Sequence, residues 1–219
     1  MTYKQILEIK RKMKFTKKQT KILNEIIISR RDVRGNNFLS KKIKKKHIHT
    51  ILNAGINAPS VGFSQPWKFL VIEDTKVKQK VYENFNQAYD KSKKYFKKRE
   101  LYTKLKLEGI RETPINIAVF YKKPTKKVLG QTSSKKMGEY SVVCAIQNIW
   151  LMARSLNIGI GWVSIIDHKK VQKTLNVSSK YKLVGYLCVG YPKKFLDTPE
   201  LETLKWEKKK TKKKVISWL

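Results

Sequence analysis

The sequence has little cysteine: among 219 residues there are only Cys144 and Cys188. They lie far apart within apolar runs, a pattern that is typical of reduced, buried thiols and not of a disulfide or a metal site. A chain of this length with 41% hydrophobic residues can bury one substantial core without covalent cross-links. We therefore expect a globular protein of a reducing compartment, and we predict a cytoplasmic location.

Long apolar runs are also missing. No stretch reaches the roughly 20 apolar residues that a membrane-spanning helix needs, and the most apolar segment, Val142 to Ala153, is interrupted by Gln147 and Asn148. The first ten residues, MTYKQILEIK, contain no continuous apolar segment of the kind found in signal peptides. We therefore expect no signal peptide and no membrane partner.

Acidic residues are scarce, since 16 Asp and Glu oppose 50 Lys and Arg and the net charge is +34. A field of this sign attracts polyanions such as nucleic acids. Arginine, the cation best suited to reading phosphates and bases, accounts for only seven of the 50 residues. This lysine excess favours a compositional bias over nucleic-acid recognition. We expect no specific nucleic-acid partner and keep a basic nucleic-acid-binding protein as the alternative.

Hydrophobic periodicity predicts helices and strands in an irregular order. Helical spacing covers the segment from the cap Thr16 to about residue 30, and then the ranges 42–57, 76–109, 138–157 and 167–175. Apolar alternation or continuous apolar runs predict strands over 68–73, 115–121, 158–166 and 182–191. Four strands interleaved with helices of unequal length indicate an α+β fold.

Three of the seven arginines, Arg30, Arg31 and Arg34, lie within five residues where the first predicted helix ends. The guanidinium group is suited to binding phosphate and carbonyl oxygens. On a helical turn, Arg30 and Arg34 would share one face. The cluster therefore indicates an anion site. The alternative is a solvated helix end in which Asp32 makes a local ion pair.

Two further segments have the composition of ligand-binding loops. The segment Asn57–Trp67 combines two prolines and a glycine with three short polar side chains that can edge a planar heteroaromatic ring, those of Ser60, Ser64 and Gln65. The segment Gly159–Ser164 begins a strand with two glycines, which indicates close approach of a ligand or of a neighbouring segment. An ordinary loop and tight backbone packing are the respective alternatives.

Several common site motifs do not occur in the sequence. No GxGxxG or GxxxxGK[ST] pattern follows a predicted strand. The three histidines, His47, His49 and His168, do not have metal-ligand spacing with a carboxylate or a thiolate. We therefore predict no metal site.

The motifs RRDVRG (30–35), APSVGFSQPW (58–67), LKLEGIRE (105–112) and GIGWVS (159–164), in this order, resemble the FMN-dependent nitroreductase family. The individual residues of these motifs are similar to those of one branch of that family, the BluB-type 5,6-dimethylbenzimidazole synthases. The resemblance covers about residues 15–207 and implies an α+β sandwich, in which helices flank a central, mainly antiparallel sheet. It also implies an intertwined homodimer with FMN at the interface. Residues 1–14 and 208–219 would then be a basic N-terminal extension and a basic C-terminal tail.

The resemblance also implies site residues. It assigns FMN binding to Arg30, Arg31, Asp32, Val33, Arg34, Ser60, Ser64, Gln65, Leu107, Gly161 and Ser164. Residues 88–108 would form a lid over the flavin, which excludes water and nicotinamide.

In the branch that the motifs resemble, reduced FMN is the substrate and O2 is the co-substrate. The products are 5,6-dimethylbenzimidazole, the lower ligand of cobalamin, and erythrose 4-phosphate. Asp32 would be the catalytic proton-transfer group and Ser164 would orient the flavin ring. A separate NAD(P)H flavin reductase would supply reduced FMN. The alternative activity is that of an NAD(P)H-dependent FMN nitroreductase or flavin reductase. Asp32 favours the first activity, because common nitroreductases usually carry a small or basic residue there.

Overall fold

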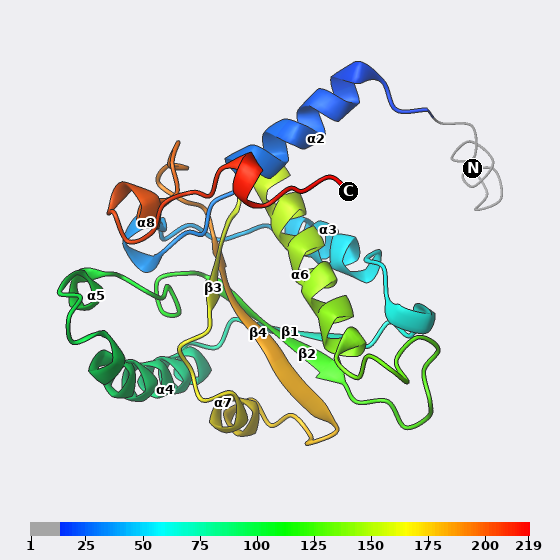
Figure 1. Cartoon of the computed structure of the whole chain (residues 1–219). Coiled ribbons are helices and arrows are strands. Elements are labelled where there is room, and N and C mark those ends of the chain that lie inside the picture. Colours follow the sequence, from blue (N-terminus) through cyan, green and yellow to red (C-terminus); the bar gives the residue numbers. More distant parts are fainter. Residues whose placement is uncertain (1–13) are drawn as a thin grey trace.

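The computed structural model describes residues 14–219, so most of the predicted N-terminal extension lies outside the described residues. The chain forms seven described α-helices and four strands (Figure 1). The helices are α2 (Lys17–Ser29), α3 (Lys45–Ile56), α4 (Thr75–Lys93), α5 (Leu101–Lys104), α6 (Met137–Ser155), α7 (His168–Thr174) and α8 (Glu200–Thr203). The strands are β1 (Trp67–Ile72), β2 (Ile115–Lys122), β3 (Gly159–Val163) and β4 (Tyr181–Gly190).

The four strands form one sheet in the order β1-β2-β4-β3, and every neighbouring pair is antiparallel. Trp67 of β1 pairs with Tyr121 of β2, Ile115 of β2 pairs with Val189 of β4, and Gly159 of β3 pairs with Gly190 of β4. All four strands predicted from the sequence are confirmed, but β3 ends at Val163 and not at residue 166, so Ser164 lies just beyond it. The predicted α+β class with an antiparallel sheet is confirmed as well.

Helices cover both faces of the sheet, which explains the continuous apolar run in β2. Ile117 and Val119 face a core formed with α3 and α6, while Ala118 and Phe120 face a second core formed with α4 and α7. Side chains alternate between the two faces of a strand, so a strand covered on both sides is apolar at every position. Figure 1 shows α6 lying across one face of the sheet, with α4 and α7 on the other.

The predicted helix over 76–109 is wrong in its second half. Helix α4 ends at Lys93, a short 3-10 turn covers Lys94–Phe96, and the chain is extended at Leu105, just after the short helix α5. The turn folds the chain back, so that the rings of Phe96 and Tyr102 stack with centroids 4.3 Å apart. Aromatic packing between two parts of the segment thus replaces a continuous helix. The predicted lid, residues 88–108, includes this turn, and its role as a lid stays a prediction.

Helix α6 is buried on one face only, which corrects one prediction. Val142, Ile146 and Ile149 are fully buried in the core, but Val143 and Cys144 are exposed. The prediction of a buried thiol is therefore confirmed for Cys188 and wrong for Cys144. Residues 14–219 of one chain cover the side of α6 that faces the sheet and α3, and they leave Val143 and Cys144 exposed.

Among the helices of the described residues, none combines the length and the apolar character required to cross a membrane.

Candidate functional site

The arginine-rich segment that follows α2 is extended, which corrects the prediction of a helical turn. Asp32 forms a parallel β-bridge with Ile160 of β3, and the Val33 N–H donates to the Ile160 carbonyl at 3.0 Å. Side chains of an extended segment alternate in direction. Asp32 and Arg34 therefore share one side of the segment, while Val33 is buried on the other.

Gly161 allows this segment to dock on β3. A Cβ atom at position 161 would overlap the carbonyl oxygen of Val33, and one at Gly159 would lie 2.8 Å from the Val33 side chain. The glycines of the GIGWVS motif thus permit close approach of a neighbouring segment. A contact between Gly161 and a flavin stays a prediction, as does flavin binding by Val33.

Arg34 and Asp32 form the centre of the site. Their side chains are ion-paired, and Arg34 Nη1 also donates to the carbonyl of Leu107 at 3.0 Å. The backbone N–H of Trp162 donates to Asp32 Oδ1 at 3.1 Å. Both charged groups are therefore oriented by backbone atoms of two other segments, β3 and the segment after α5.

Arg30 and Arg31 are each fixed by a different kind of contact. The Arg30 guanidinium lies over the Trp150 ring, 5.0 Å from its centroid. Arg31 donates to the carbonyl of Ile28 at 2.7 Å and to the carbonyl of Asp197. Arg31 Nε is buried and has no hydrogen-bond partner within the described part of the chain. The cluster therefore retains unused donor capacity.

The arginines line a cavity of about 150 Å³. It brings together five predicted site residues, Arg30, Arg31, Asp32, Arg34 and Leu107. It also includes residues that were not assigned from the sequence, Leu105, Lys106, Leu196, Pro199, Glu200 and Leu201. A signal for Leu105 and Lys106 was present, because they fall within the motif LKLEGIRE. The cavity thus joins cations, two carboxylates and apolar leucine side chains.

The cavity alters the acid–base properties of Asp32. Withdrawal of the carboxylate from solvent raises the pKa of Asp32 above its usual range. The positive charge of Arg34, the hydrogen bond from Trp162 and the charge of Arg30 oppose this rise, and the negative charge of Glu200 adds to it. A carboxyl group with a raised pKa holds a proton more readily than an ordinary aspartate, which suits it to proton transfer.

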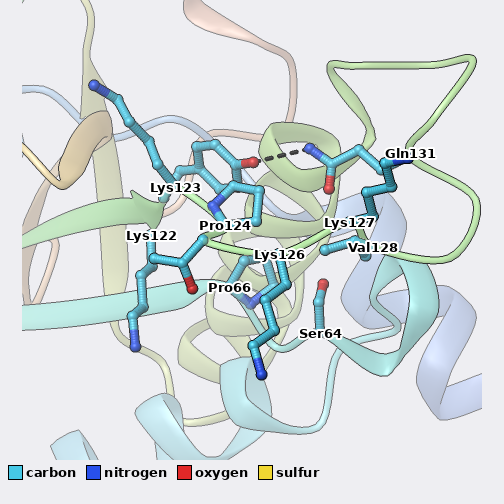
Figure 2. Close-up of a pocket in the computed structure, with 11 residues that line it drawn as sticks. Ser64, Pro66, Lys122, Lys123, Pro124, Lys126, Lys127, Val128 and Gln131 are labelled. Carbon is cyan, nitrogen blue, oxygen red and sulfur yellow. Dashed lines mark hydrogen bonds between the residues drawn. The ribbon is translucent and has the colours of Figure 1, made fainter.

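The second group of predicted residues lies elsewhere in the chain. Ser64 lines a separate cavity of about 250 Å³, between the loop that precedes β1 and the loop that follows β2 (Figure 2). The Ser60 hydroxyl accepts a hydrogen bond from the Gln65 N–H at 3.0 Å and so stabilises its own loop. The arginine cavity of the same chain is lined by none of the three residues Ser60, Ser64 and Gln65.

Ser164 also lies outside the arginine cavity. It is an exposed residue just after β3, and its carbonyl accepts a hydrogen bond from the Ile166 N–H at 2.9 Å. Its catalytic role stays a prediction. Across residues 14–219, no group of three or more His, Cys, Asp or Glu side chains is arranged to hold a metal ion.

Residues 27–191 match the model of the Nitroreductase family, and the chain belongs to this family. The chain is 37% identical to the 5,6-dimethylbenzimidazole synthase of Rhodospirillum rubrum over 185 residues, which cover 83% of this chain and 87% of that protein. It is 33% identical to a 5,6-dimethylbenzimidazole synthase of Rhodobacter capsulatus, across 89% of this chain and 95% of that protein.

Solved structures show the same fold. A BluB-like flavoprotein from Clostridium difficile 630 aligns with a TM-score of 0.68 and 19% identity, over 90% of this chain and 98% of that one. A nitroreductase with bound FMN from Bacteroides fragilis aligns with a TM-score of 0.63 and 22% identity, over 90% of this chain and 98% of that one. At these identities the likeness concerns the fold.

Proposed function

We propose that this protein is a 5,6-dimethylbenzimidazole synthase, which uses O2 to fragment reduced FMN into 5,6-dimethylbenzimidazole and erythrose 4-phosphate. The observation that carries the proposal is the position of Asp32, a carboxylate with a raised pKa inside a cavity lined by three arginines. The identity of 37% and 33% to two synthases over most of their lengths supports the same activity.

The cavity residues fit FMN. Arg30, Arg31 and Arg34 offer guanidinium donors for a phosphate and for ring oxygens, and Arg31 Nε is a buried donor whose partner a ligand can supply. The leucine side chains of the cavity, among them Leu105 and Leu107, offer an apolar surface for a flat ring. When bound, FMN supplies the ring system that reacts with O2 and is cleaved.

We further propose that the complete site needs a second copy of the chain. Small-molecule pockets usually measure about 300–1,000 Å³, whereas the arginine cavity measures about 150 Å³. The predicted flavin residues Ser60, Ser64 and Gln65 line no part of it. In a homodimer, this loop of one copy would complete the arginine cavity of the other.

Exposed apolar side chains supply a surface for the second copy. No residue of α2 is buried, although the helix carries Ile22, Leu23, Ile27 and Ile28, each between 47% and 60% exposed. Val143 on α6 adds to the exposed apolar area. Large exposed apolar patches mark interaction sites, and these faces therefore support the homodimer.

Each part of the site would have a separate role in the reaction. Asp32 holds and moves protons at its carboxylate, and Arg34 with the Trp162 N–H orients that carboxylate. Ser164 would orient the ring, and residues 88–108 would exclude water and nicotinamide. Because a nicotinamide is excluded, a separate NAD(P)H flavin reductase would deliver reduced FMN.

The direct test mixes the purified protein with photoreduced FMN and air, with no reductase present. We expect 5,6-dimethylbenzimidazole to appear by chromatography, and to be absent when the reaction is kept anaerobic. The competing activity, an NAD(P)H-dependent nitroreductase or flavin reductase, predicts a different result. In that case NAD(P)H alone would bleach the bound flavin under argon, and no dimethylbenzimidazole would form with photoreduced FMN.

A further inference from the structure

The segment from Leu105 to Gly109 is hydrogen-bonded to the arginine-rich segment, and its first three residues line the cavity. The Gly35 N–H donates to the Glu108 carbonyl at 2.7 Å. One residue away on each side, Arg34 Nη1 donates to the Leu107 carbonyl at 3.0 Å. The position of the Leu107 carbonyl therefore helps to set the position of the Arg34 guanidinium.

A buried cluster of charges holds this segment in place. Glu108 is only 2% exposed and is the one buried acidic side chain among residues 14–219. Its Oε2 accepts from the Ile110 N–H at 2.8 Å, and its Oε1 is ion-paired with Lys106. Lys106 Nζ also lies 2.8 Å from Glu112 Oε1. A buried carboxylate is costly unless it is paired and hydrogen-bonded, and this one is both.

The same cluster accounts for the glycine that ends the RRDVRG motif. A Cβ atom at Gly35 would lie 2.7 Å from Lys106 Cε, 2.8 Å from Glu112 Cδ and 2.9 Å from the Glu108 carbonyl oxygen. All three distances are below 3.0 Å, and the Glu108 carbonyl oxygen is a backbone atom that cannot easily move aside. The arginine-rich segment and the charged cluster therefore occupy positions that depend on each other.

We propose that Lys106 and Glu108 are positioning residues of the flavin site, which fix the Leu107 carbonyl and through it Arg34 and the Asp32 carboxylate. The inference rests on the proposed function, since it assumes that this cavity binds FMN. Each link is a direct contact: Lys106 with Glu108, Leu107 with Arg34, and Arg34 with Asp32. A cluster that served stability alone would have no effect on ligand affinity in the folded protein.

The test uses the full-length protein and four substitutions. Lys106→Met removes the cation and keeps an unbranched apolar side chain, whereas Lys106→Arg keeps the charge and both possible ion pairs. Lys173→Met, at an exposed lysine of α7, removes the same charge outside the site. Glu108→Gln keeps the shape of the buried side chain but removes its charge. Lys106 is 33% exposed, so Lys106→Met keeps the test possible if Glu108→Gln does not fold.

Three measurements separate positioning from stability. The first is the dissociation constant of FMN by flavin fluorescence, and the second is hydrogen exchange at the Gly35 amide without FMN. The third is the ratio of dimethylbenzimidazole to peroxide formed from reduced FMN. For Lys106→Met and Glu108→Gln we expect affinity about tenfold or more weaker, the usual size for losing a charge-assisted contact, faster exchange at Gly35 and a lower product ratio. Lys106→Arg should restore all three, and Lys173→Met should leave all three unchanged.

The outcomes are distinguishable. If folded Lys106→Met binds FMN and partitions product as the wild type does, the cluster is only structural and the inference is overturned. If Lys173→Met weakens binding as much as Lys106→Met, overall charge and not position explains the effect, which also overturns it. If the wild type binds FMN but makes no dimethylbenzimidazole, the proposed function fails, while FMN affinity and Gly35 exchange still decide the positioning role. A wild type that binds no FMN overturns both.

Discussion

The carboxylate of Asp32 is ion-paired with the guanidinium of Arg34, two residues further along the same side of an extended segment. This ion pair is compatible with two different roles for Asp32. Either the carboxylate orients an arginine that binds FMN, or it is itself the group that moves protons during the reaction. The two roles predict opposite effects of one substitution.

Asp32→Asn keeps the size of the side chain and removes its charge. If Asp32 is the proton-transfer group, the variant should still bind and oxidise reduced FMN with release of peroxide. Loss of a general acid–base group typically costs about 10²–10⁴-fold in rate, so dimethylbenzimidazole should fall by at least about a hundredfold. Product formation at the wild-type rate would refute the role, and weakened FMN binding alone would favour the orienting role. Ser164→Gly should uncouple oxidation from product formation in a similar way.

Arg30→Ala should weaken FMN binding, because it removes a guanidinium from the cavity. The expected loss is about 1.5–3 kcal/mol, the usual size for one charge-assisted hydrogen bond. A fluorescence titration with FMN measures it. Arg111→Ala, at an arginine that stacks on Tyr82 outside this cavity, is the matched control. Equal affinity of Arg30→Ala and wild type would remove Arg30 from the site.

Stability should depend on pH through Asp32. Its pKa is raised in the folded protein, chiefly by withdrawal from solvent, so in the window between the unfolded and folded pKa values the folded state binds more protons. Stability from this group is present below the unfolded pKa, near 4, and is lost as pH rises through the folded pKa. Urea unfolding should therefore show Asp32→Asn gaining stability relative to wild type across that window.

Glu200→Gln provides a second check of the same prediction. The negative charge of Glu200 contributes to the raised pKa of Asp32. Removal of this charge should lower the folded pKa of Asp32 and so narrow the pH range between its unfolded and folded pKa values. Glu202→Gln, on the same short helix but outside the cavity, should leave the window unchanged. A pH dependence that is identical for both variants and the wild type would contradict the effect of Glu200.

The protein should be a homodimer at micromolar concentration, with a light-scattering mass twice the 25.7 kDa of one chain. Leu23→Asp places a charge on the apolar face of α2, where Leu23 is 53% exposed, and should shift the mass toward the monomer. Asn24→Asp introduces the same residue at the neighbouring polar position and should remain a dimer. A wild-type monomer with FMN present would count against the composite flavin site.

Nucleic-acid binding should be weak and independent of sequence despite the charge of +34. Such binding arises from counterion release, so the logarithm of the affinity should fall linearly with the logarithm of the salt concentration. Titration of a labelled duplex at several salt concentrations measures the slope. Tight binding to one sequence at physiological salt would revive the nucleic-acid alternative.

Much of the secondary structure could be predicted from local sequence because its causes are local. The Thr16 side chain and Gln19 form the capping box that starts α2, and Asp167 caps α7 through the backbone N–H groups of Lys169 and Lys170. The unbroken apolar run of β2 required cover on both faces of the sheet. The arginine cluster was visible as a departure from a lysine-rich composition.

The geometry of the site depended on contacts between residues that are distant in the sequence. The segment after α2 is extended because it pairs with β3, more than a hundred residues later, and the Asp32–Trp162 hydrogen bond spans the same separation. Helical periodicity could not reveal this pairing, since it reports only neighbours within a few turns. Glu200 and Lys106 likewise line the cavity because of tertiary contacts, which helical periodicity does not report. The sequence by itself thus determined which residue types were available, and only tertiary packing decided which of them share a cavity.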